Sequence, residues 1–170
     1  RTVVIGSCAA LNSAGNYTGS VLIGYTAGKC ARVTDTVAIG NEVLSVSTSS
    51  GNCSVLIGAR AAKNSTGSRN IVIGSDAFST ATTGNDIVAI GPDTLKSIAS
   101  GQCNAIAIGT RALTNSLRSG LAIGVDALCA NTTGVSNLAI GNRALRCNLE
   151  GEHNLAVGND ALCAGHDTLI

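Results

Sequence analysis

The sequence is poor in aromatic and charged residues and contains no methionine or tryptophan. Aromatic residues make up 2% of the 170 residues, charged residues 12%, and there is a single proline. A globular core of ordinary thickness needs large side chains to fill it, whereas the many Val, Ile, Leu and Ala residues here suit a thin, layered interior. The composition therefore predicts a narrow cross-section.

The formal net charge is only +1, and no hydrophobic stretch runs far before a glycine or polar residue interrupts it. A chain without a basic field lacks the attraction that draws proteins to phosphate backbones or anionic membranes. No apolar run approaches the about 18 residues of a membrane span. We therefore expect neither nucleic-acid binding nor membrane insertion.

Motifs for catalysis and for cofactor or metal binding are also missing. The sequence has no phosphate loop, dinucleotide fingerprint or nucleophile elbow. His153 and His166 are isolated, and no cysteine and histidine grouping has zinc-like spacing. Repetition also spreads each residue type along the chain, which is the opposite of a converging pocket. We expect no enzyme activity, no cofactor and no metal.

An internal repeat covers the whole chain. An apolar triplet followed by glycine occurs ten times at intervals of 15 to 18 residues. In the best-formed units the glycine is followed by two variable residues and then Ala-Leu, and a polar turn with a second glycine separates the units. The ten repeated glycines, which we expect to form a tight corner in every unit, are Gly6, Gly24, Gly40, Gly58, Gly74, Gly91, Gly109, Gly124, Gly141 and Gly158.

Units this short, with β-branched triplets bounded by glycine, favour strands over helices. One unit cannot bury its apolar side alone, but stacked units form continuous parallel sheets around one core. The sequence predicts an all-β, parallel β-solenoid (β-roll) of about ten coils, with two short strands and two turns in each. It would be a single domain over residues 1–170, which we expect to be a segment of a longer fibre, and a rod on the order of 45 to 50 Å long.

The alternation of side chains along a strand predicts which residues are buried. The first and third residues of each triplet are large and aliphatic and are expected to form the interior. The middle residues, which are also apolar, would then form an exposed stripe that a soluble monomer rarely tolerates. The alternative is that the Ala-Leu strand of the same coil covers them. The predicted oligomer-face column comprises Ala107, Ala122, Ala139 and Ala156.

Charged residues and cysteines recur in fixed phases of the repeat. Stacking would place side chains of alternating sign above one another two residues after the key glycine, as a ladder that fixes register. Three cysteines five or six residues after their glycines would form a column within reach of one disulfide, although buried, reduced thiols are the favoured interpretation. The ladder is Arg111, Asp126, Arg143 and Asp160, and the cysteine column is Cys129, Cys147 and Cys163.

The repeat resembles two families of fibrous proteins. An asparagine lies shortly before the segment Ala-Ile-Gly-x-x-Ala-Leu, as in Asn104 to Leu113. A polar turn such as Asn131-Thr132-Thr133-Gly134 precedes the asparagine of the unit, here Asn137. This pattern resembles the head repeats of trimeric autotransporter adhesins and the repeats of bacteriophage tail fibres. The resemblance spans all ten units. It implies a left-handed parallel β-roll, usually a homotrimer, that serves as shaft or adhesive head, and it implies no receptor-binding residue because the matching positions are scaffold ones.

These observations lead to a structural or adhesive segment of an extracellular fibre, on a virion tail or a cell surface, as the expected function. Its partners would be further copies of itself and a host-cell surface receptor or glycan. An alternative is a secreted filament subunit that stacks head to tail, because no capping repeat is evident at either end. An ice-binding solenoid is a remote alternative, since a regular Thr-x-Thr column is missing.

Overall fold

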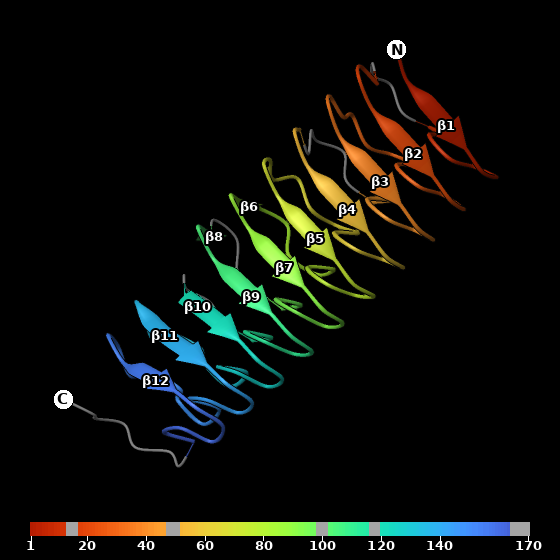
Figure 1. Cartoon of the computed structure of the whole chain (residues 1–170). Helices are drawn as coiled ribbons and strands as arrows, with labels where there is room; N and C mark the ends of the chain where they lie inside the picture. The colour runs from red at the N-terminus through yellow and green to blue at the C-terminus, as the bar shows by residue number, and fades with distance from the viewer. Residues whose placement is uncertain (13–16, 47–51, 98–101, 116–119, 164–170) are drawn as a thin grey trace.

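The chain forms a parallel β-solenoid whose coils stack in a single row, with the first and last coils at opposite ends (Figure 1). The computed structural model describes residues 1–12, 17–46, 52–97, 102–115 and 120–163, and this part contains no helix. Ten strands pair in chain order into one sheet. They are β1 (Val3–Ile5), β2 (Val21–Ile23), β3 (Val37–Ile39), β4 (Val55–Ile57), β5 (Ile71–Ile73), β7 (Val88–Ile90), β9 (Ile106–Ile108), β10 (Gly120–Ile123), β11 (Asn137–Ile140) and β12 (Leu155–Val157).

The register between coils is set by the repeated triplet. Every neighbouring pair is parallel and matches residue for residue, so that Ala122 lies between Ala107 and Ala139. A shift by one residue would exchange the two faces of the sheet, which is why the repeat tolerates no slip. Ten strands at the usual spacing give a sheet about 43 Å long. The all-β parallel solenoid predicted from the sequence is confirmed.

The expectation of two strands in every coil is wrong. Only β6 (Gly84–Asn85) and β8 (Gln102–Cys103) form a second, two-stranded sheet among the described residues. The Ala-Leu segment consists of turns instead: the Gly124 carbonyl accepts from the Ala127 N–H at 3.4 Å, with a φ of 58° at Asp126. This hydrogen bond and the positive φ at the third residue match a type II turn.

The turns keep a left-handed backbone at large residues. Leu128 has a φ of 51°, and Leu145 in the next coil has the same value. This conformation costs an ordinary residue about 1–2 kcal/mol, whereas burying a leucine side chain contributes about 1.5–3 kcal/mol. Leu128 is fully buried, and its N–H donates to the Ala144 carbonyl of the next coil at 3.0 Å. Burial of the leucine side chain and the backbone hydrogen bonds between coils therefore outweigh the strain of the left-handed conformation.

The predicted assignment of inner and outer faces is also wrong, because the structure reverses it. The middle residues of the triplets point into the rod: Ala107, Ala122 and Ala139 are 0% exposed and Ala156 is 3% exposed. The first and third residues, expected to be inside, are partly or largely exposed on the opposite face. The four alanines therefore form no oligomer face. The alternative, that the Ala-Leu segment of the same chain covers them, is correct for this column.

The reason is the small thickness of the coil. The middle residue of each triplet packs against the residue four positions after the corner glycine of the same coil. These two residues must share a limited volume. Leu22 faces Gly28, where an added Cβ would lie 3.0 Å from a Leu22 methyl group. In most later coils the sizes are reversed, as in Ala122 with Leu128. Small strand residues are therefore what allows one chain to close its core.

Candidate interaction surface

The outward face of the ten-stranded sheet is uniformly aliphatic. We call its two rows of side chains the outer columns; each triplet contributes its first residue to one and its third to the other. Exposed fractions are 43% at Ile71 and 38% at Ile106, and they rise to 65% at Val157 in the last coil. The first column comprises Val3, Val21, Val37, Val55, Ile71, Val88, Ile106, Leu121, Leu138 and Leu155, and the second comprises Ile5, Ile23, Ile39, Ile57, Ile73, Ile90, Ile108, Ile123, Ile140 and Val157.

The continuity of this face distinguishes it from scattered surface hydrophobics. Ten strands at about 4.8 Å and three residues at about 3.3 Å give an area on the order of 450 Å². The largest apolar patch of a typical soluble monomer measures about 300–600 Å² and is often functional. No charged or polar residue interrupts either column. The outer columns are therefore the strongest candidate for an interaction surface.

The glycine that follows each strand keeps the coils in step at the corner. Gly124 has a φ of 137°, a conformation essentially restricted to glycine. A Cβ on it would overlap the carbonyl oxygen of Gly141 in the next coil. Nine of the ten corner glycines repeat this close approach, because each has a further coil above it. Their predicted role as structural turn residues is confirmed.

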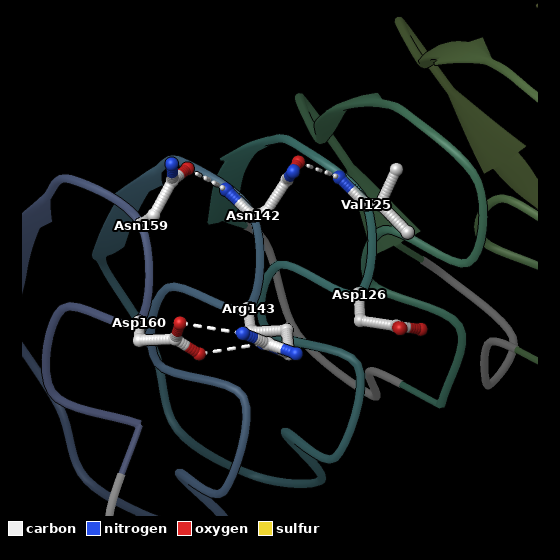
Figure 2. A pocket seen from close by; sticks show the side chains of 6 residues that line it. All are labelled: Val125, Asp126, Asn142, Arg143, Asn159 and Asp160. Atoms are coloured by element: carbon white, nitrogen blue, oxygen red, sulfur yellow. Dashed lines mark hydrogen bonds and ion pairs between the residues drawn. The ribbon is translucent and has the colours of Figure 1, made fainter.

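The predicted charge ladder forms at the same corner as separate pairs. The Nε and Nη2 atoms of Arg111 donate to the two carboxylate oxygens of Asp126 at 2.6 and 2.7 Å. Arg143 binds Asp160 in the same bidentate way at 2.5 and 2.6 Å, whereas the Asp126 carboxylate points away from Arg143 (Figure 2). Opposite charges on neighbouring coils are thus confirmed, but each arginine forms an ion pair with one aspartate and not with two.

The pairs shift the titration of both partners. The hydrogen bonds from Arg111 hold the pKa of the Asp126 carboxyl below its ordinary value, and those from Asp126 raise the pKa of the guanidinium. The arginine side chains are about half exposed, at 53% for Arg111 and 50% for Arg143. Exposed pairs contribute little to stability, so their main effect is to fix which residues stack.

Sequence reasoning missed a second charged column. Arg69 binds Asp86 through two hydrogen bonds of 2.7 and 2.8 Å, in a corner located two residues before the strands β5 and β7. Both residues have a positive φ, as does His153 in the same phase of a later coil. Residues at this position all lie two places before the first residue of a triplet. Aligning the units on the triplet, and not only on the glycine, would have shown this column.

The C-terminal corner groove shows how completely the scaffold uses its polar groups. It is lined by Val125, Asp126, Asn142, Arg143, Asn159 and Asp160 and has a volume of about 320 Å³. The side-chain oxygen of Asn142 accepts from the Val125 N–H at 3.2 Å, and that of Asn159 accepts from the Asn142 N–H at 3.1 Å (Figure 2). The amide and charged side chains that line this groove are bonded to neighbouring coils. They therefore stabilise the stacking of the coils and are not free to bind a ligand.

Buried asparagines explain the recurrent spacing of glycine and asparagine between units. Asn137 is 3% exposed; its amide donates to the Gly151 carbonyl at 2.7 Å, and its side-chain oxygen accepts from the Asn154 N–H at 2.9 Å. Asn70 donates to Gly84 in the same way at 2.8 Å. Asn104 differs, because it occupies an exposed corner with a φ of 59°. The inner asparagines satisfy backbone groups that would otherwise be buried without partners.

The three cysteines do not form the predicted column. Leu128 and Leu145 occupy equivalent positions, so Cys129 is stacked on Arg146, and Cys147 lies one position further along its coil. All three are free thiols; Cys129 and Cys163 are partly exposed and Cys147 is exposed. The expectation of reduced thiols agrees with this, but the expectation that they are buried is wrong. Unequal spacing from the preceding glycine was the signal against a common column.

The described residues show no metal centre. They contain no group of three or more His, Cys, Asp or Glu side chains placed to hold a metal ion. His153 is exposed, and His166 lies outside the described residues. In the same part of the chain, no helix meets the length and hydropathy needed to cross a membrane.

Comparison with known proteins returned no relative: no family model, no curated protein and no solved structure matches this chain.

Proposed function

We propose that this chain is a structural or adhesive segment of an extracellular fibre, assembled from parallel copies that pack through their outer columns. The observation that carries the proposal is the aliphatic face that runs the whole length of the sheet without interruption. Covering such a face from water is the strongest available driving force for association. A fibre is the assembly that a rod with one apolar side forms most directly.

A second copy is the partner whose shape fits best. The face is narrow and about 43 Å long, so an occupant must be equally long, straight and apolar. Another outer face meets all three conditions. Association of identical subunits closes by rotational symmetry, and the resemblance to adhesin heads and tail fibres favours three subunits around an axis over two.

Sedimentation of the purified chain tests this proposal. We expect the wild type to sediment at about three times the 16.8 kDa mass of one chain. Ile123→Glu places a charge on the outer face and is expected to yield monomers with an unchanged circular dichroism spectrum. Thr133→Glu adds the same charge at an exposed turn and is expected to leave the assembly intact. A wild type that is monomeric at high concentration would show that the proposal is wrong.

The end coil supports a second candidate, a filament that grows head to tail. Val4 belongs to the inner column but is 43% exposed, whereas Leu22 in the next coil is fully buried, because β1 pairs with a neighbour on one side only. A further stretch of the same polypeptide or the last coil of another copy would cover this edge. Electron microscopy separates the two: filaments with an axial repeat of about 48 Å favour this candidate, and discrete rods favour the fibre segment.

A further inference from the structure

A second corner groove differs in chemistry from the one in Figure 2. We call it the Tyr25 groove; its volume is about 230 Å³. Tyr25 follows the corner glycine of its coil, the position that Asn142 and Asn159 occupy in the C-terminal corner groove. Its polar and aromatic lining comprises Tyr25, Thr26, Lys29, Glu42, Ser45 and Lys63.

Tyr25 is the one aromatic side chain that the chain displays. The sequence has three aromatic residues in all, and Phe78 is fully buried while the Tyr17 hydroxyl donates to the Gly28 carbonyl at 3.0 Å. Tyr25 is 56% exposed, and its hydroxyl has no hydrogen bond to any described residue. Its ring contributes nothing to the core, so the fold does not explain its presence.

Thr26, at the base of the groove, is the least well satisfied polar residue of this corner. It is only 7% exposed, and its Oγ1 is the single buried side-chain polar atom without a hydrogen bond among the described residues. Leaving a buried hydroxyl unpaired is unfavourable. In later coils the same position holds charged side chains that are paired, such as Asp126 with Arg111. The Thr26 position therefore lacks the side-chain partner that Asp126 has at the equivalent place in its coil.

The charges of the groove leave one cation uncompensated. Lys63 Nζ lies 2.8 Å from Glu42 Oε2, and this hydrogen bond lowers the pKa of Glu42 below its ordinary value. The Lys29 side chain forms no ion pair with a described residue. A ligand with one negative charge is therefore favoured over a neutral one.

We propose that the Tyr25 groove binds a single pyranose ring that carries a carboxylate. The aromatic face of Tyr25 would stack on the apolar C–H face of the sugar, and Lys29 would pair with its carboxylate. Glu42 and Ser45 offer hydrogen-bonding groups for the ring hydroxyls. The volume lies below that of sites for drug-sized ligands, about 300 Å³ and more, which suits one ring. This inference rests on the adhesive form of the proposed function and names its partner class.

Calorimetric titration of the full chain with methyl β-D-glucuronide and methyl β-D-glucoside tests the proposal. We expect saturable binding of the glucuronide and at least about tenfold weaker binding of the glucoside, as loss of a charge-assisted hydrogen bond predicts. Tyr25→Ala should abolish binding and Tyr25→Phe should retain it. Lys29→Gln should remove the preference for the glucuronide. Arg143→Ala, in the C-terminal corner groove, is the control and should bind as the wild type does.

The outcomes separate this inference from the fibre proposal. No glucuronide binding at millimolar concentration, or binding that Tyr25→Ala leaves unchanged, would overturn the sugar site. Because Tyr25 lies outside the outer columns, the Tyr25→Ala variant is expected to sediment as the wild type does. A wild type that assembles but binds no sugar therefore contradicts only the sugar site, and a monomer that binds the sugar contradicts only the assembly.

Discussion

The two faces of the ten-stranded sheet are built from neighbouring residues and have opposite roles. Ala139 faces the core and is fully buried, whereas Ile140 beside it is 36% exposed. Both faces are apolar, so hydrophobicity does not distinguish inside from outside. What distinguishes them is size: the thin interior accepts alanine opposite leucine, and the larger β-branched side chains are left on the open face. In a rod this narrow, volume decides burial.

A charge placed on each face in turn tests which face is the core. Ala139→Asp buries a carboxylate without a partner, so we expect it to lower the free energy of unfolding by several kcal/mol, a large part of the about 5–15 kcal/mol that a domain has. Ile140→Asp, its neighbour on the outer face, should leave the fold intact and affect assembly only. Thermal unfolding followed by circular dichroism measures both. Equal destabilisation of the fold by the two variants would contradict the assignment of faces.

A size exchange across the core gives the next largest effect. Leu56 is in the strand and Ala62 is in the facing turn, the reverse of the usual order of sizes. Leu56→Ala should cost about 2–5 kcal/mol, because it leaves a cavity. Adding Ala62→Leu restores the pattern of the later coils and should recover most of that loss. Denaturant unfolding of the two single variants and the double variant gives the coupling energy, and simple additivity would show that these positions do not face each other.

The fold could be predicted from the sequence because it depends on a repeat. The apolar triplet, the corner glycine and the near-constant interval are local and recur ten times, so chance agreement is negligible and the parallel sheet follows. The charge pairs could be predicted for the same reason: equal phase in successive coils means contact. Arg69 with Asp86 was missed only because its phase was counted from the glycine and not from the strand.

The direction of the faces could not be obtained from alternation alone. A period of two says that Ala122 and Ile123 point to opposite sides, but not which side is the core. The missing information is the coil thickness, which depends on the turn segment. The exchange of sizes between Leu22 and Gly28, and between Ala122 and Leu128, carries this information in the sequence. The left-handed leucines could not be foreseen, since neither pattern nor propensity favours a positive φ at leucine.

The smallest expected effect on stability concerns the ion pairs at the corner, which belong to neither face of the sheet. The folded-state pKa of Asp126 lies below its ordinary value because of Arg111. A depressed carboxyl pKa contributes stability that is present above the unfolded pKa, about 4, and is lost as the pH falls through the folded value. Arg111→Gln should therefore lower the melting temperature slightly at neutral pH, and the difference from the wild type should disappear in acid.

Arg69→Gln provides the matched control for this edge. Its partner Asp86 is 40% exposed, against 15% for Asp126, so solvent screens that pair more strongly. Its effect at neutral pH should be smaller still. Melting curves across the acidic range decide the matter: a deficit of Arg111→Gln that persists unchanged in acid would mean that the arginine acts by packing its aliphatic stem on the neighbouring coil, and not through the charge of Asp126.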